Sequence, residues 1–176
     1  MENILRPLRE SDAPYMLEWM HDPDAVSGLR TDFASRTIND CTAFIASSLT
    51  GTDSCHLAIT DMSDEYLGTC SLKNIDRTMR TAEFGIVIRR CAMGTGIAQK
   101  AMRQIIEYGF DELDLDRIFW CVDPVNKRAM RFYDKNGYHR ADAGPGSDVC
   151  DAALKAGYTQ EEVLRYSWYE IVRGGS

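Results

Sequence analysis

The spacing of apolar residues along the chain alternates between helical and strand-like periods. A short apolar stretch at 4–8 predicts a strand, and apolar positions then recur every three and four residues in two segments. The first segment predicts a helix that Ser11 caps and that ends near residues 22–23, and the second predicts a helix that Thr37 caps. The intervening residues 23–36 are predicted to form a loop.

Three short runs with the period of a strand follow, and turn-forming residues separate them. They predict an antiparallel meander at 55–60, 66–75 and 82–88. A wide apolar stripe from 96 to 113 predicts a long amphipathic helix that packs on the sheet. The remaining predicted elements are a buried strand at 117–122, a helix from Asn126 to 136–137, a loop with a short helix at 151–155, and an aromatic-rich strand at 163–172.

This order of elements predicts an α/β fold with a mixed, mostly antiparallel sheet and flanking helices. The length of 176 residues suits a single domain over 1–176. Apolar residues make up 44% of the chain and charged residues 27%, which is typical of a globular protein and argues against a disordered one.

The chain is acidic, with 20 basic and 27 acidic residues and a formal charge of −7. Neutralising phosphates requires a cationic face, so the composition argues against a nucleic-acid partner. An acidic balance instead favours the approach of a cationic substrate. The loop that carries Asp22, Asp24 and Asp32 could line a cleft for such a substrate; ordinary solvated charge is the alternative.

Six cysteines are spread along the chain, and no CxxC pair is present to begin a metal or redox site. They are predicted to be free thiols, and no metal site is expected. The start of the chain lacks the pattern of a secretory signal, and no stretch approaches the roughly 18 apolar residues of a membrane helix. We therefore expect a cytoplasmic protein with no membrane partner.

The segment from Phe84 to Ile106 carries most of the candidate chemistry. An apolar strand leads into a cationic turn, and GTGIA at 94–98 then opens the long helix. Glycines allow a ligand to approach the backbone, and a helix start offers unpaired N–H groups that suit a phosphate. A glycine turn that merely joins strand and helix is the alternative. Gln99 stands where the dinucleotide pattern GxGxxG needs its third glycine, and GxxxxGK[ST] is absent.

This segment resembles the acetyl-CoA motif of the GNAT superfamily of N-acetyltransferases, Gln/Arg-x-x-Gly-x-Gly/Ala after a strand. The resemblance continues through LRPLRESDAPYMLEWMHDP, YLGTCSL, TAEFGIVI and VNKRAMRFYDKNGY, and is strongest to the branch with ribosomal-protein N-terminal and spermidine acetyltransferases. It implies an enzyme that transfers acetyl from acetyl-CoA to a primary amine, either a small molecule or a peptide N-terminus. It also implies direct attack in a ternary complex.

The resemblance further implies a cofactor-binding strand edge. The backbone groups of Ile86 and Ile88 would pair with the pantetheine arm like an added strand. Val87 lies between them, and a backbone N–H in this stretch would polarise the thioester carbonyl.

The turn after this strand would hold the pyrophosphate. The residues implied are Met93, Gly94, Thr95, Gly96, Ile97 and Ala98. Met93 occupies the Gln/Arg position of the motif, so a side-chain contact is missing there. Arg89 or Arg90 is a candidate to replace that contact.

Tyr133 and Asn126 receive roles by resemblance, and Glu83 is a candidate because it is an acid inside an otherwise apolar strand. Tyr133 falls where the family keeps a tyrosine that protonates the departing CoA thiolate, whereas the apolar pattern alone indicates a packed aromatic. Glu83 could accept the ammonium proton of the amine, directly or through water, with an ion-paired strand glutamate as the alternative. Asn126 matches an asparagine that binds the cofactor arm or an ordered water, and it can also simply cap the next helix.

Other interpretations stay open at this stage. The transferred group could be another short acyl group, or the protein could be a catalytically silent CoA-binding or regulatory protein. The acceptor amine is not identified, because the segments that would build its pocket, 23–36 and 144–157, carry no motif. The oligomeric state is equally open, with a homodimer as one possibility.

Overall fold

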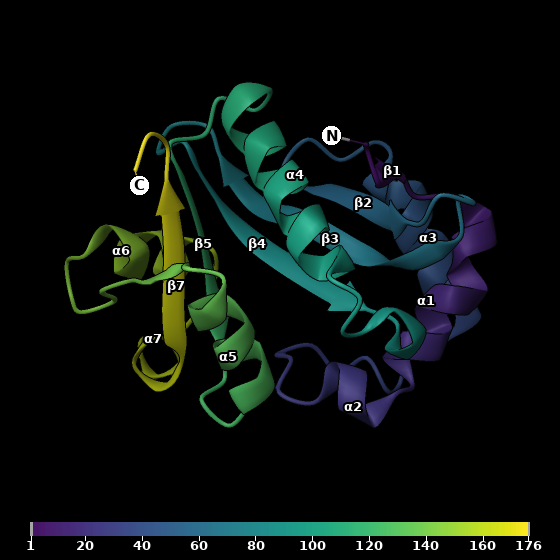
Figure 1. Cartoon of the computed structure of the whole chain (residues 1–176). Coiled ribbons are helices and arrows are strands. Elements are labelled where there is room, and N and C mark those ends of the chain that lie inside the picture. The colour runs from purple at the N-terminus through teal and green to yellow at the C-terminus, as the bar shows by residue number, and fades with distance from the viewer. Residues whose placement is uncertain (1, 176) are drawn as a thin grey trace.

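The backbone forms a seven-stranded sheet in the order β1-β2-β3-β4-β5-β7-β6 in the computed structural model, which describes residues 2–175 (Figure 1). Neighbouring strands are antiparallel except for the parallel pair β4 and β5. The predicted mixed, mostly antiparallel sheet is confirmed. The strands are β1 (Leu5–Pro7), β2 (Cys55–Thr60), β3 (Tyr66–Asp76), β4 (Thr81–Ile88), β5 (Arg117–Val122), β6 (His139–Arg140) and β7 (Ser167–Val172).

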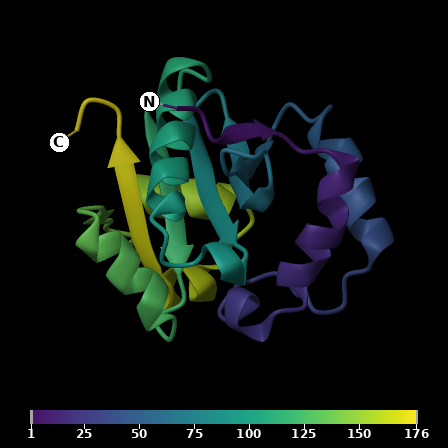
Figure 2. The same cartoon turned by 45° about the vertical axis from the view of Figure 1, so that its right-hand side comes forward.

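Helices cover both faces of the sheet. They are α1 (Ala13–Met20), α2 (Pro23–Val26), α3 (Ile38–Ser48), α4 (Ile97–Asp111), α5 (Lys127–Lys135), α6 (Asp148–Lys155) and α7 (Gln160–Arg165). Helices α4 and α5 share one apolar cluster with the sheet, while α1 and α3 share a second and α6 and α7 a third (Figures 1 and 2).

Side chains of β5 alternate between these layers. Ile118 and Trp120 belong to the cluster under α4 and α5, whereas Phe119 belongs to the cluster with α6 and α7. A strand that is buried on both faces needs apolar residues at successive positions, which explains the nearly continuous apolar sequence RIFWCV of β5.

Two predicted helix caps are confirmed. The Thr37 side chain accepts a hydrogen bond from the Asp40 N–H, and the Asp40 carboxylate accepts one from the Thr37 N–H, forming a capping box. The Asn126 Oδ1 accepts a hydrogen bond from the Ala129 N–H at 3.1 Å. These bonds satisfy N–H groups that the first turns of α3 and α5 would otherwise leave unpaired.

The predicted cap of the first helix is wrong. Residues Glu10–Asp12 form a 3-10 turn ahead of α1, and Ser11 lies inside this turn. Asp12 instead occupies the N-cap position of α1, and its carboxylate accepts a hydrogen bond from the Arg9 N–H.

Two predicted segments near the site also differ in detail. The predicted loop 23–36 contains α2, because Pro23 begins a helical turn at a position where its missing N–H is not needed. The short helix predicted at 151–155 begins at Asp148, where the Ser147 side chain accepts a hydrogen bond from the Cys150 N–H.

The start of the predicted strand 163–172 is helical. Thr159 and Glu162 form a capping box that begins α7, and the strand β7 follows the end of this helix. Val163 lies on α7, where its side chain is buried and packs with Trp168. Its apolar character therefore reflects a position in the core and not the alternation of apolar and polar residues along a strand.

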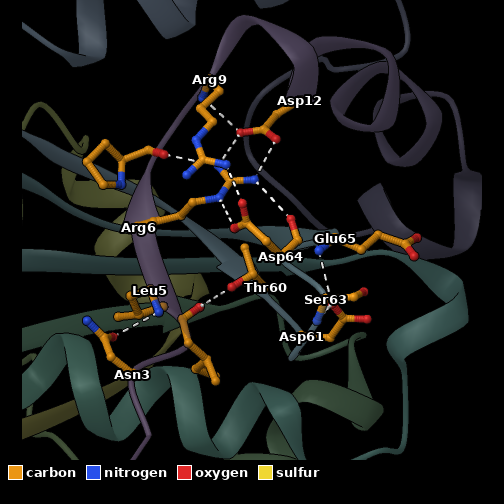
Figure 3. A network of polar contacts seen from close by, with 12 residues as sticks. Asn3, Leu5, Arg6, Arg9, Asp12, Thr60, Asp61, Ser63, Asp64 and Glu65 are labelled. Carbon is orange, nitrogen blue, oxygen red and sulfur yellow. Dashed lines mark hydrogen bonds and ion pairs between the residues drawn. The ribbon is translucent and has the colours of Figure 1, made fainter.

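A polar network fixes the segment ahead of α1 to the turn between β2 and β3 (Figure 3). Arg6 donates to both carboxylate oxygens of Asp12, at 2.8 and 2.9 Å, and to Asp64 at 2.7 Å. Arg9 also pairs with Asp64. Asp12 is only 2% exposed, so these donors compensate the loss of hydration of a buried carboxylate.

The close approach of β3 to the end of β4 makes Gly68 sensitive to substitution. A Cβ at Gly68 would lie 2.3 Å from the Val87 carbonyl oxygen and 3.1 Å from the Ile88 Cα. We expect Gly68→Ala to lower the free energy of unfolding by about 1–3 kcal/mol in urea denaturation, since overpacking against backbone forces the strands apart. Gly51→Ala is the control, because its Cβ would meet the Ser47 carbonyl oxygen at an ordinary 3.5 Å. Equal losses would contradict this explanation.

Candidate active site

Strands β4 and β5 separate soon after they begin. Their parallel pairing joins residues 81–83 of β4 to residues 117–119 of β5 and does not continue. The two strands open into a V in Figure 1. Residues 84–88 of β4 therefore have no strand partner on the β5 side, and we call this gap the β4–β5 opening.

The register of β3 and β4 determines which backbone groups face this opening. The Arg89 N–H donates to the Leu67 carbonyl at 2.8 Å, at the end of a ladder that pairs Val87 with Thr69. Backbone bonding alternates along an antiparallel strand, so the N–H and C=O of Val87 face β3. Those of Ile86 and Ile88 face the opening, as pairing with an extended ligand requires. The Val87 N–H is committed to β3, which leaves Ile86 and Ile88 as the available donors.

The start of α4 has no side-chain cap. Gly96 is its N-cap residue with a φ of 85°, and Gly94 has a φ of 80°. Both lie in the left-handed region that favours glycine. A Cβ on either would meet no atom within 4 Å, so backbone conformation and not lack of space selects glycine in this chain.

An open cavity borders this helix start, and we call it the cradle. Thr95, Gly96 and Ile97 line it, together with Lys100 one helical turn further on, and Asp61 and Glu65 also line it. The uncapped N–H groups at the positive end of the helix are the part of this lining that suits a pyrophosphate, and Lys100 adds a cation that the sequence analysis missed. Glu65 is paired with Arg89, which compensates its charge. Of the other residues expected here, Met93, Gly94 and Ala98 are adjacent in the chain but are not among those lining the cradle.

Neither candidate arginine is free to replace a side chain at position 93. Arg89 is 8% exposed and pairs with Glu18 at 3.1 Å and Glu65 at 2.9 Å. Arg90 pairs with two aspartates at the start of α2. The structure therefore leaves the phosphate contact to backbone groups and to Lys100, whose ion pair with Glu2 is long at 4.0 Å.

The acidic loop is engaged in the same ion pairs. Asp22 and Asp24 lie 2.6 and 2.7 Å from Arg90, and Asp22 also accepts a hydrogen bond from the Asp24 N–H. The bond from Arg90 lowers the pKa of Asp22, so its carboxylate is ionised but compensated. The hypothesis that this loop attracts a cationic substrate is not supported by these two residues.

A cavity of about 430 Å³ crosses the β4–β5 opening, and we call it the inner cavity. Glu83 lines it on the face covered by α6 and α7, and Tyr133 lines it on the face covered by α4 and α5. Ile86 and Val87 border it between them. The structure thus brings both candidate catalytic side chains into one space beside the candidate cofactor strand.

Tyr133 projects from α5 into the core. Its ring packs on Trp120 and Tyr169, with centroid distances of 5.3 and 5.2 Å. Its hydroxyl has no hydrogen-bond partner among residues 2–175. Burial raises the pKa of Tyr133 above its ordinary value of 10, so the phenol is protonated at neutral pH.

Glu83 is 4% exposed and is surrounded by donors. Lys73 Nζ lies 3.3 Å from its Oε1, Asn74 Nδ2 donates to its Oε2 at 2.9 Å, and the Tyr158 hydroxyl donates to Oε1 at 2.6 Å. An ionised carboxylate only accepts hydrogen bonds, and these partners match that state. The ion-paired interpretation of Glu83 is confirmed, and it is compatible with a role as a base.

Tyr158 is a site residue that the sequence analysis missed. It lies between α6 and α7, and burial raises its pKa, so the phenol remains a donor to Glu83. The Arg30 guanidinium stacks 4.3 Å from the Tyr158 ring centroid and pairs with Glu162 of α7 at 2.7 Å. These contacts join the loop after α2 to the α6–α7 segment. No local sequence signal links residues so far apart.

Asn126 and His56 lie at the margins of the site. Asn126 caps α5 and packs against Gly28, where a Cβ would be 3.4 Å from the Asn126 Cβ, and it lines neither the cradle nor the inner cavity. Its cofactor role remains a prediction.

His56 lines the inner cavity and bonds to the Ser71 hydroxyl at 2.7 Å. Burial lowers the pKa of His56 to about 4, so it is neutral at neutral pH.

Trp120 holds a buried donor without a partner. Its side chain lines the inner cavity, and its Nε1 is the one enclosed side-chain polar atom among residues 2–175 that lacks a hydrogen bond.

Among residues 2–175, no group of three or more His, Cys, Asp or Glu could hold a metal. No described helix is both long and apolar enough to cross a bilayer.

Comparison with known proteins agrees with this geometry. Residues 3–139 match the acetyltransferase (GNAT) domain family. The chain is 28% identical over 145 residues to the uncharacterized N-acetyltransferase p20 of Bacillus licheniformis, covering 77% of this chain and 78% of that protein. It is 27% identical over 144 residues to the spermidine N(1)-acetyltransferase of Escherichia coli strain K12, covering 76% and 71%.

The fold is similar to the crystal structure of spermidine N-acetyltransferase from Vibrio cholerae in complex with CoA and spermine. The TM-score is 0.76 at 17% identity, and the match covers 96% of this chain and 94% of that one. The family match includes β4, the cradle, Glu83 and Tyr133. This chain therefore belongs to the GNAT family and is an acetyl-CoA-dependent N-acetyltransferase that transfers an acetyl group to an amine.

Proposed function

We propose that the acetyl group moves inside the inner cavity by direct attack of a bound primary amine in a ternary complex. The observation that carries this proposal is the single cavity that joins Glu83, on one side of the β4–β5 opening, to Tyr133 on the other. The amine belongs to a small molecule or to a peptide N-terminus. Its body enters from the Glu83 side, because the α1, α3 and α6–α7 side chains line the cavity there.

Backbone groups hold the CoA. The outward-facing N–H and C=O groups of Ile86 and Ile88 pair with the pantetheine arm, and the uncapped start of α4 with Lys100 holds the pyrophosphate. The thioester supplies an activated acetyl group and a thiol leaving group. An N–H of Ile86 or Ile88 stabilises the charge that develops on the carbonyl oxygen.

Two protons move in opposite directions at the two faces. An amine attacks only as the neutral species, so Glu83 accepts the ammonium proton, directly or through water. As the new C–N bond forms and the C–S bond breaks, Tyr133 donates its proton to the sulfur. Tyr158, Lys73 and Asn74 orient the Glu83 carboxylate.

Two further proposals, on location and on oligomeric state, and one assay of the alternative functions accompany this mechanism. We place the enzyme in the cytoplasm, where the six free thiols would persist. Release of free thiol from acetyl-CoA in the presence of amines separates an enzyme from a silent CoA binder, and the same assay with longer acyl-CoA donors tests other short acyl groups. A homodimer remains a prediction that a measurement of solution mass decides.

CoA binding should depend on the backbone at the start of α4. CoA at a hundredfold excess over its dissociation constant should stabilise the parent protein by about 2.7 kcal/mol. Gly96→Val should abolish this thermal shift, because a β-branched residue cannot keep a φ of 85°. Gly146→Val is the matched control, because Gly146 has a φ of 83° and lines neither cavity, and this variant should lose stability but keep the shift. An unchanged shift in Gly96→Val would reject the cradle.

Tyr133→Phe should lower kcat by about 10²- to 10⁴-fold, the usual effect of losing a positioned acid, with CoA affinity nearly unchanged. The phenylalanine keeps the ring packing on Trp120 and Tyr169. Tyr138→Phe is the control, because Tyr138 also packs on Trp120 but does not line the inner cavity. A parent-like kcat in Tyr133→Phe would assign the proton transfer to another group.

Glu83→Gln should lower kcat by a similar 10²- to 10⁴-fold at neutral pH, because the proton acceptor is lost. The deficit should shrink at alkaline pH, where more of the amine is already neutral. A purely structural role would lower the melting temperature without this rescue by pH. Glu170→Gln is the control, since Glu170 pairs with Arg117 outside both cavities.

A further inference from the structure

The wall of the inner cavity on the Glu83 side is aromatic. The helices and loops of both neighbouring layers contribute rings to it, and Trp19 and Phe33 meet edge to face at 5.1 Å. A flat apolar surface of this kind favours a ligand with a ring or a branched apolar body. The wall rings are Trp19, Phe33, Phe44, Tyr158 and Tyr166.

The acidic side chains around the cavity already have partners. Glu83 pairs with Lys73 at 3.3 Å, and Asp123 pairs with Arg165 at 3.1 Å. Asp40 accepts hydrogen bonds from Thr37 in the capping box of α3, and its charge is compensated by that of Arg36. The cavity therefore offers no uncompensated carboxylate to a second or third ammonium group of a substrate.

The cations around the cavity are matched in the same way. Hydrogen bonds from Thr37 lower the pKa of Asp40, and so does the charge of Arg36, so Arg36 and Asp40 compensate each other. His56 is neutral and adds no charge. A second positive charge on the substrate would lose its hydration without gaining a free carboxylate, and a cost of this kind is a common source of specificity.

We propose that the acceptor is a monoamine with an aromatic or branched apolar body, and that the aromatic wall and the absence of an uncompensated carboxylate select it against polyamines. This inference rests on the proposed function, because it places the amino group at Glu83. The relatives named for spermidine share the fold and the family, whereas this selectivity follows from the residues that line this chain's own cavity.

The direct test measures kcat/KM for a matched set of amines with saturating acetyl-CoA. We expect an arylalkylamine such as 2-phenylethylamine to exceed spermidine by about 10²-fold, the scale of a well-filled apolar pocket. Ethanolamine, which has one charge but no apolar body, should also fall well below 2-phenylethylamine. A preference for spermidine or for ethanolamine would overturn the proposal.

Two variants separate the wall from the charge. Phe33→Ala should lower kcat/KM for 2-phenylethylamine about 10-fold or more and leave ethanolamine nearly unchanged. Arg36→Glu should raise kcat/KM for spermidine about 10-fold or more with a smaller effect on 2-phenylethylamine. Arg103→Glu is the control for net charge, because Arg103 lies on α4 and borders neither cavity. Equal effects of Arg36→Glu and Arg103→Glu would reject the role of the charges that line the cavity.

The outcome distinguishes this inference from the proposed function. Preferential acetylation of polyamines would overturn the selectivity and leave acetyl transfer at Glu83 and Tyr133 intact. If none of the amines in the set caused thiol release, while CoA still stabilised the protein, the proposed function and the selectivity would both be overturned.

Discussion

The early separation of β4 from β5 is the constraint on which the site depends. After three paired positions β4 keeps its partner on the β3 side and loses it on the other, which leaves backbone donors and acceptors unpaired inside the molecule. An extended polar ligand satisfies such an edge in the way that a strand would. The same separation lets Glu83 and Tyr133, held on opposite faces of the sheet, reach one cavity.

Local features of the fold and site could be predicted from the sequence. The apolar stripe of α4 and the caps at Thr37 and Asn126 depend on residues three or four positions apart, so their signals are contained in short windows. The glycine-rich turn into α4 is similarly local, because the left-handed backbone at Gly94 and Gly96 requires those residue types. Together with the family resemblance, these windows predicted a cofactor-binding strand and a phosphate-binding turn.

Contacts between distant segments could not be predicted. The Tyr158 hydroxyl reaches Glu83 across 75 positions, and the interpretation of 163–172 as one strand concealed the helix α7 that follows Tyr158. The capping box at Thr159 and Glu162 was a usable signal for that helix. Arg89 and Arg90 looked available for phosphate in the sequence, but partners far along the chain neutralise both.

The unpartnered Trp120 Nε1 gives the protein a built-in optical reporter. The indoles of Trp19 and Trp168 already donate, to the Tyr66 hydroxyl at 2.8 Å and to the Val163 carbonyl at 2.9 Å. A ligand carbonyl that reaches Trp120 in the inner cavity supplies the partner that its Nε1 lacks, and a ligand in this cavity also changes the surroundings of Trp19, whereas Trp168 does not line it. Indole emission and near-ultraviolet circular dichroism respond to such a change, so occupancy of the site can be followed without an added label.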